Sequence, residues 1–265
     1  MIMIVVRNLW KSFGKNQVLR DLSLEVQTGE TLVVLGRSGV GKSVLLKHIM
    51  GLTKPDEGTI EVNGTEITSL KENVLYSAVR NMGMLFQGSA LFDSMTIGEN
   101  TAFYLDQHGD PKTGLPLSKE EIESRIAEAL ALVNLTNTEH LMPSDLSGGM
   151  RKRAALARLI VYRPAILLYD EPTTGLDPIT AMQINDLINK TKKELKATSI
   201  VVTHDIRSAL EVGDRLAFHH EGKIAHIAPR DDFFRSNNPL IKDFLHKAFP
   251  NHVAENNNNV WAGGL

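Results

Sequence analysis

The sequence predicts an α/β fold with a parallel sheet, an antiparallel β subdomain near the N-terminus and an inserted α-helical subdomain. Three observations predict it. Largely apolar runs over 31–35, 165–169 and 199–203 are typical of parallel strands that are covered on both faces. Residues 2–26 carry alternating segments of the kind that half-buried strands show. The stretch from 88 to about 160 changes to helical periodicity.

The composition limits the function. The chain has 265 residues, with 29 basic and 31 acidic residues and a net charge of −2, so no strong overall field favours nucleic acid or an anionic membrane. It has no cysteine, which excludes a disulfide framework and thiol metal sites and fits a reducing compartment. The apolar start over 1–6 is too short for a signal core, and no apolar run is long enough to span a membrane. We expect no nucleic-acid partner and no membrane span.

The N-terminal segments predict β-structure. Leu22, Leu24 and Val26 alternate with polar residues, as in a half-buried strand. Phe13 lies between two such segments, where its ring could stack on a purine base or pack as an ordinary hairpin residue. Its position alone gives the two interpretations equal weight.

A glycine-rich loop follows the first apolar run and leads into a helical segment. The loop has Walker A spacing and consists of Gly36, Arg37, Ser38, Gly39, Val40, Gly41, Lys42 and Ser43, with Val44 opening the helix. The glycines allow a tight turn in which successive backbone N–H groups face phosphate oxygens. Lys42 adds a charge that can reach the β- and γ-phosphates, and Ser43 supplies a hydroxyl ligand for Mg²⁺. The loop therefore predicts nucleotide binding rather than a chance glycine turn.

Two short β elements come next. Thr59–Gly64 predicts a strand that enters an Asn-Gly hairpin turn. Residues 83–87 predict a second apolar strand that ends on Gln87. A polar side chain at a strand end lies where ligands gather in open α/β sheets.

Helical patterns dominate after Gln87. Residues 108–116 predict a loop, and Ser118 and Glu121 have the spacing of a capping box. The stripe that follows predicts an amphipathic helix packed on a core, and its members are Ile122, Ile126, Ala129, Leu130 and Val133.

A second helix start carries a serine and two glycines. Ser147, Gly148 and Gly149 precede a basic helix, and such an end can bind an anion through free N–H groups. The plain alternative is an ordinary serine N-cap on a solvated basic helix. Because the chain already has one phosphate loop, two phosphate-facing ends suggest a shared nucleotide site.

Two acidic residues follow the buried run over 165–169. Asp170 suits a Walker B role, in which it holds Mg²⁺ directly or through water. Glu171 is a candidate general base that orients and polarises the attacking water.

A histidine ends the run over 199–203. A lone histidine is more often structural, but His204 is expected at the same sheet edge as Gln87 and Asp170. We assign His219 and His220 to surface or core. The tail holds an amphipathic segment over 239–249, an asparagine run and Trp261, which fits either docking on a partner or a frayed terminus.

The motifs together resemble those of ABC-type ATPases in order and spacing. The matching parts are the Walker A loop, Gln87, Leu146 to Gly149, Asp170-Glu171, Asp177 and His204. The resemblance covers residues 4 to about 228. It implies a P-loop NTPase (RecA-like) core over 1–87 and 161–228, a helical subdomain over 88–160 that carries the signature motif, and a C-terminal extension over 229–265.

The resemblance also implies roles. Phe13 resembles the adenine-stacking aromatic, and Gln87 the Q-loop glutamine that contacts Mg²⁺ and water. Asp177 resembles the D-loop aspartate and His204 the switch histidine. Ser147 to Gly149 resemble the signature motif, which closes over ATP held by the opposite subunit.

A narrower resemblance concerns Met150, which stands where glutamine usually follows the two glycines. Met150 to Arg158, and Gly83 to Gln87 followed by Ala90 to Asp93, resemble the ATP-binding subunit of Mla-type phospholipid transporters associated with MCE proteins. In that group C-terminal extensions contact the other ATPase copy, so the Trp261 tail is expected to dock there.

These resemblances predict an ATP-hydrolysing subunit that uses ATP and Mg²⁺, with Lys42, Glu171 and His204 as catalytic residues. Expected partners are a second copy, an integral membrane permease, a small regulatory subunit and an MCE-type lipid-binding protein. The expected location is cytoplasmic, on the inner face of the cell membrane. The alternatives are an importer ATPase for a polar solute and a soluble non-transport ABC ATPase.

Overall fold

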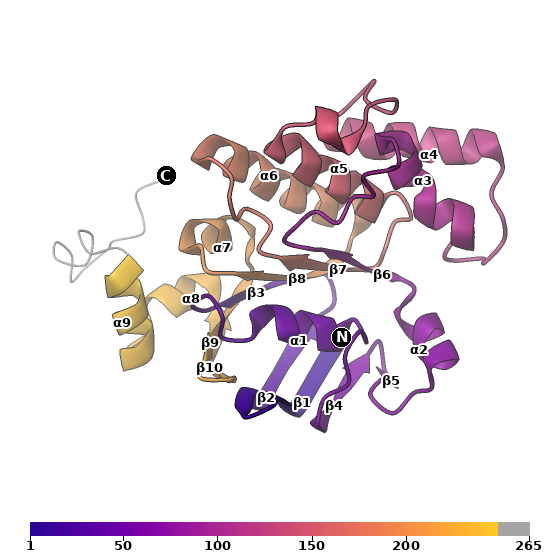
Figure 1. Cartoon of the computed structure of the whole chain (residues 1–265). Helices are drawn as coiled ribbons and strands as arrows, with labels where there is room; N and C mark the ends of the chain where they lie inside the picture. Colours follow the sequence, from indigo (N-terminus) through magenta and orange to yellow (C-terminus); the bar gives the residue numbers. More distant parts are fainter. Residues whose placement is uncertain (249–265) are drawn as a thin grey trace.

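The structure is a computed structural model that describes residues 1–248, so Trp261 and the asparagine run lie outside the described residues. Its larger sheet has six strands (Figure 1). In spatial order these are β10 (Lys223–Pro229), β9 (Arg215–His220), β3 (Thr31–Leu35), β8 (Thr198–Thr203), β7 (Ile166–Asp170) and β6 (Met82–Leu85). All neighbours are parallel except β10, which runs antiparallel to β9. The predicted α/β fold is confirmed.

This sheet is covered on both faces. Along β3, Val33 and Leu35 belong to one hydrophobic cluster, while Leu32 and Val34 belong to another. Successive side chains of a strand point to opposite faces, so the two clusters lie on either side of the sheet. This explains why the parallel strands appear as unbroken apolar runs in the sequence.

The smaller sheet is antiparallel. Its spatial order is β2 (Asn16–Gln27), β1 (Ile2–Phe13), β4 (Glu57–Val62) and β5 (Thr65–Glu66). The predicted alternation is confirmed, because Leu22, Leu24 and Val26 are buried between exposed residues. Asn63 and Gly64 both have positive φ, as the predicted Asn-Gly turn between β4 and β5 requires.

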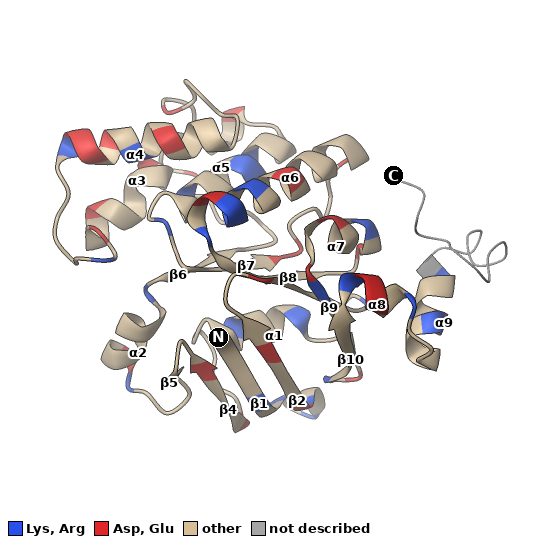
Figure 2. Ribbon diagram, turned by 180° about the vertical axis from the view of Figure 1, so that it is seen from behind, with Lys and Arg blue, Asp and Glu red and all other residues tan. Residues whose placement is uncertain are grey.

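Helix α1 (Lys42–Ile49) lies between the two sheets, as both ribbon views show (Figures 1 and 2). Leu45, Leu46 and Ile49 are fully buried in the cluster that joins the sheets. The helix that follows the glycine loop is thus held by the core from both sides.

The other face of the larger sheet is covered by helices. These are α3 (Ile97–His108), α4 (Lys119–Leu132), the short 3₁₀ helix η1 (Pro143–Asp145), α5 (Gly148–Ile160), α6 (Pro178–Leu195) and α7 (Ile206–Val212). The predicted stripe on α4 packs into this cluster. The Ser118 hydroxyl accepts from the Glu121 backbone N–H, but the Glu121 carboxylate pairs with Arg125 at 3.0 Å. The complete capping box belongs instead to Thr96 and Glu99 at the start of α3.

The remaining helices are α2 (Glu72–Val79), α8 (Arg230–Phe234) and α9 (Pro239–Ala248), the last two at the β9–β10 edge of the larger sheet (Figure 1). No helix among residues 1–248 has both the length and the apolar character needed to cross a bilayer. The boundaries at 88, 161 and 229 stay predictions.

Candidate nucleotide site

The predicted site residues follow neighbouring parallel strands. The glycine loop follows β3, Glu171 follows β7 and His204 follows β8. Since β8 lies between β3 and β7, the three loops emerge side by side at the carboxyl edge of the sheet. This edge is the usual ligand-binding position in open parallel sheets.

The glycine loop has free N–H groups. In the described part of the chain, the backbone N–H groups of residues 37–41 donate no hydrogen bond. Gly41 has φ of 106°, and a Cβ there would lie 2.6 Å from Cγ1 of Val18. A Cβ on Gly36 would lie 2.7 Å from the His219 carbonyl oxygen. Glycine at both positions lets the loop sit closely against β2 and β9 and present its N–H groups to an anion.

Lys42 is buried beneath this loop, with 5% of its surface exposed. Its Nζ donates to the carbonyl oxygens of Gly36 at 2.8 Å and Arg37 at 3.0 Å. The same atom lies 3.2 Å from Oε1 of Glu171. The ammonium therefore joins the phosphate loop to the acidic end of β7.

Ser43 and Asp170 form a pair of oxygen ligands. The Ser43 hydroxyl donates to Oδ1 of Asp170 at 2.7 Å. Burial raises the pKa of the Asp170 carboxyl, the Ser43 hydrogen bond opposes this shift, and the nearby Glu171 charge adds to it. A hydroxyl and a buried carboxylate suit Mg²⁺, which prefers oxygen ligands together with substrate phosphates. The two residues thus fit the metal that such a loop would need.

Glu171 is held at several points. Its backbone has φ of 48°, which turns the chain sharply out of β7, and its Oε2 lies 2.9 Å from Nδ1 of His204. The hydroxyls of Thr174 and Thr203 donate to the same oxygen at 3.0 and 3.4 Å. His204 keeps 51% of its side chain exposed. The structure therefore presents a fixed carboxylate and an accessible imidazole together at this edge.

The signature segment lies at the start of α5. The Ser147 hydroxyl accepts from the Met150 backbone N–H at 3.3 Å, which makes it a normal N-cap. Asp177 caps α6 in the same way, and its Oδ2 accepts from the Thr180 hydroxyl at 2.5 Å. Among residues 1–248, neither the segment Ser147–Gly149 nor Asp177 forms a hydrogen bond with Lys42 or Glu171. Within one chain, the glycine loop and the start of α5 are therefore not hydrogen-bonded to each other.

Two predicted site residues, Gln87 and Phe13, are exposed at the ends of strands or in the turns beyond them. The strand prediction over 83–87 was too long, because β6 ends at Leu85 and exposed Gln87 lies in the turn beyond it. Phe13 ends β1 with 52% of its surface exposed, and Lys11 Nζ lies 5.6 Å from its ring centroid. An exposed ring at a hairpin end leaves a face free for stacking.

Two further buried side chains lie near the site, and of these the sequence analysis assigned only His219, to surface or core. Lys152 of α5 is 5% exposed and donates to the Gln87 carbonyl oxygen at 2.5 Å. His219 of β9 is 1% exposed, and burial lowers its pKa to about 4. Lys152 stands in a run of basic residues that predicts a solvated face, so no sequence signal separates it from its neighbours.

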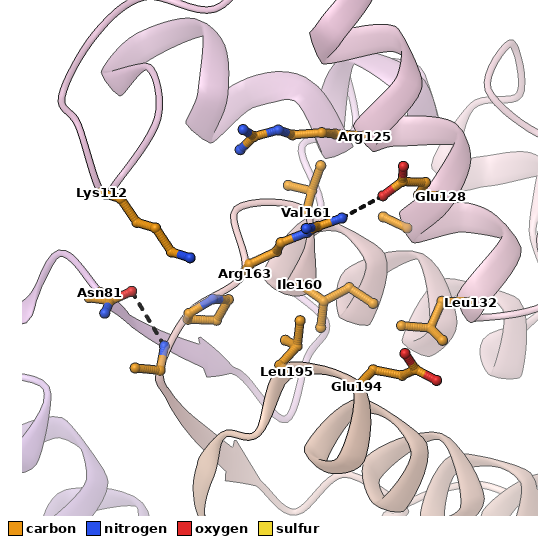
Figure 3. Close-up of a pocket in the computed structure, with 13 residues that line it drawn as sticks. Asn81, Lys112, Arg125, Glu128, Leu132, Ile160, Val161, Arg163, Glu194 and Leu195 are labelled. Carbon is orange, nitrogen blue, oxygen red and sulfur yellow. Dashed lines mark hydrogen bonds and ion pairs between the residues drawn. The ribbon is translucent and has the colours of Figure 1, made fainter.

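A cavity of about 540 Å³ lies at the opposite edge of the sheet (Figure 3). It is lined by residues at the amino ends of β6 and β7, such as Asn81 and Ala165, and by the end of α6. Its arginines are paired, Arg163 with Glu128 at 2.7 Å and Arg125 with Asp110 at 2.8 Å. This cavity holds none of the predicted site residues.

Comparison with known proteins agrees with the motifs. The profile of the ABC transporter family matches residues 19–174. The probable ribonucleotide transport ATP-binding protein mkl of Mycobacterium tuberculosis (strain ATCC 25618 / H37Rv) is 40% identical over 92% of this chain and 66% of its own length. The chain thus spans just under two thirds of that relative.

Two further proteins are similar along more of their length. The chloroplastic protein TRIGALACTOSYLDIACYLGLYCEROL 3 of Arabidopsis thaliana is 37% identical over 92% of this chain and 73% of its own. The ATP-binding cassette MJ0796, solved as a dimer in a post-hydrolysis state with ADP and Pi, is 31% identical with a TM-score of 0.78. That match covers 86% of this chain and 99% of the cassette. From its motifs, its fold and these matches, the chain belongs to the ABC transporter family and is an ABC-type ATPase.

Proposed function

We propose that two copies of this chain bind two ATP molecules, each between Gly36–Ser43 of one copy and Ser147–Gly149 of the other. The observation that carries this proposal is that the two phosphate-facing ends of one chain share no hydrogen bond among residues 1–248. Only a second copy would complete the site. The similar cassette MJ0796, which was solved as a dimer with ADP and Pi, supports a dimeric assembly.

The residues at the sheet edge divide the catalytic work. Lys42 and the N–H groups of the loop stabilise charge on the phosphoryl oxygens, and Ser43, Asp170 and Gln87 are the candidate holders of Mg²⁺. When bound, that ion would neutralise phosphate charge. Glu171 accepts the proton of the attacking water, and His204 fixes the Glu171 carboxylate.

The outer contacts complete the nucleotide site. Phe13 stacks on the adenine from its exposed position at the end of β1. Asp177, which caps α6, lies on the face that meets the second copy. These assignments follow from the family resemblance and from the exposure of both residues.

The test is Glu171→Gln. The variant keeps the size of the side chain but cannot accept the proton, so we expect turnover to fall by about 100-fold or more while ATP drives a stable dimer. Light scattering with ATP and with ADP measures the dimer. Glu194→Gln, an exposed substitution at the end of α6, is the matched control. Unchanged turnover in Glu171→Gln would contradict the role of Glu171 as base.

We further propose that this ATPase powers movement of phospholipid between bacterial membranes through a separate membrane subunit. The resemblance of Met150–Arg158 to Mla-type ATPases supports it, as does similarity to a plant relative named after a glycerolipid. The partners are then a permease, a small regulatory subunit and an MCE-type protein, with the ATPase on the cytoplasmic face of the inner membrane.

A polar solute is the second candidate substrate, because the mycobacterial relative is named for ribonucleotide transport. Purification of the chain from membranes with its integral subunit separates the candidates. Phospholipid that copurifies and stimulates ATP turnover supports the first, and stimulation by a nucleotide-like solute alone supports the second. Recovery of the chain without any integral subunit would favour a soluble ABC ATPase.

A further inference from the structure

Three consecutive basic residues of α5 point to different partners. Arg151 donates to the Leu146 carbonyl at 2.6 Å and Arg153 to the Asn134 carbonyl at 3.1 Å. Lys152 alone turns toward the sheet, where its Nζ donates to the Gln87 carbonyl at 2.5 Å. The Gln87 side chain is left free by this contact, because the bond uses its backbone oxygen.

The position of Lys152 is energetically demanding. It is 5% exposed, and a buried ammonium loses its hydration unless hydrogen bonds and opposite charges replace it. Burial lowers the pKa of Lys152, and the carboxylates of Asp170 and Glu171 oppose that shift. The ammonium therefore lies within electrostatic reach of both acidic residues at the end of β7.

A second bond fixes the same segment to α5. Arg158 donates to the Ala90 carbonyl at 2.5 Å, and its guanidinium lies 4.2 Å from the ring centroid of Phe92. The segment from Gln87 to Phe92 is thus tied to α5 at two places. Both ties are hydrogen bonds to backbone carbonyl oxygens of this segment.

We propose that Lys152 is a positioning residue that holds Gln87 to α5, so that Gln87 and the signature end at Ser147 move as one unit. Ser147 is the N-cap of α5 and Lys152 lies five positions further along the same helix, so a shift of one is passed to the other through the helix. This inference rests on the proposed function, because it gives Gln87 and Ser147 a shared task at the nucleotide.

Lys152→Met tests the tie, since it keeps the length of the side chain but has no donor or charge. We expect faster hydrogen exchange over residues 86–93 in nucleotide-free protein and a fall in kcat of at least about tenfold, the size expected for one lost bond to a charged group. Affinity for a fluorescent ATP analogue should stay near the wild-type value. Lys152→Arg should restore protection and most of the turnover.

Arg153→Met is the matched control, because it removes a neighbouring charge whose bond goes to Asn134 instead. If Lys152→Met fails to fold, Lys152→Gln replaces it. Wild-type exchange over 86–93, or faster exchange over the whole chain, would overturn the inference. Absence of ATP turnover in the wild-type protein would overturn the proposed function instead, and the exchange comparison would still test the tie.

Discussion

Lys42 and Glu171 form a buried ion pair, with Nζ 3.2 Å from Oε1, although the two residues are far apart in the sequence. Both side chains are at most 10% exposed. The Glu171 carboxylate thus balances the buried charge of Lys42.

Removal of the Lys42 ammonium should strongly weaken nucleotide binding. Lys42→Ala leaves Glu171 without its lysine partner and the loop without its charge, so we expect ATP affinity to fall by about 100-fold, as for loss of a charged hydrogen bond of about 3 kcal/mol. Titration with a fluorescent ATP analogue measures this loss. Lys190→Ala, at an exposed position on α6, should bind like the wild type.

Asp170→Asn should stabilise the metal-free protein. Burial and the Glu171 charge raise the pKa of Asp170, and an acid with a raised pKa contributes stability below its unfolded-state pKa that is lost as pH rises through the folded-state value. At pH 7 the ionised carboxylate is therefore unfavourable, and asparagine removes it. Calorimetry in EDTA should show a higher Tm.

The same Asp170→Asn variant should lose the stabilisation that the wild type gains from ATP with Mg²⁺. Asp186→Asn, an exposed position on α6, is the control for the charge change. A lower Tm for metal-free Asp170→Asn would show that the carboxylate is stabilised by contacts other than those described.

His219 should make the fold sensitive to acid. Its pKa is lowered to about 4 because burial disfavours the charged ring, and neither ring nitrogen has a hydrogen-bond partner among the described residues. The neutral ring contributes stability that is present above the unfolded-state pKa and is lost as pH falls from about 6.5 toward 4. Between pH 7.5 and 5 this loss is about 2 kcal/mol.

His219→Leu removes the titrating group, so its free energy of unfolding should change less over that interval, as urea unfolding at the two pH values would show. His220→Gln, at the next position of β9, controls for a change of histidine in the same strand. An unchanged pH dependence in His219→Leu would mean that other groups cause the acid loss.

Two neighbouring glycines of α5 should respond differently to alanine. A Cβ on Gly149 would lie 2.6 Å from Cγ2 of Thr180, whereas a Cβ on Gly148 would meet nothing within 4 Å. We expect Gly149→Ala to destabilise the fold by about 1–3 kcal/mol through overpacking of α5 on α6. Gly148→Ala should keep its stability and weaken only ATP-driven dimerisation, as thermal unfolding and light scattering would show.

Much of the fold follows from local patterns. The apolar runs that became β3, β7 and β8 are buried on both faces, and their polar endings mark the sheet edge where Lys42 and His204 both contact Glu171. The Asn63-Gly64 turn can also be predicted from its own two residues, since such a turn needs residues that tolerate positive φ.

The missing parts depend on neighbours that are distant in sequence. Thr174 and Thr203 bond to Glu171 only because β7 and β8 lie side by side. Lys152 is buried and bonds to the Gln87 turn, and nothing in a run of basic residues predicts that. The length of β6 was overestimated because an apolar run does not show where strand pairing stops.

The close approach of Gly41 to Val18 has one more consequence. With no side chain between them, the hairpin that ends at Phe13 stands at a set distance from the phosphate loop. A ligand that binds both Phe13 and the phosphate loop would have to match this distance, so the β1–β2 hairpin selects ligands by their length. A side chain at position 41 would change the distance between Phe13 and the loop before it changed phosphate binding by the loop.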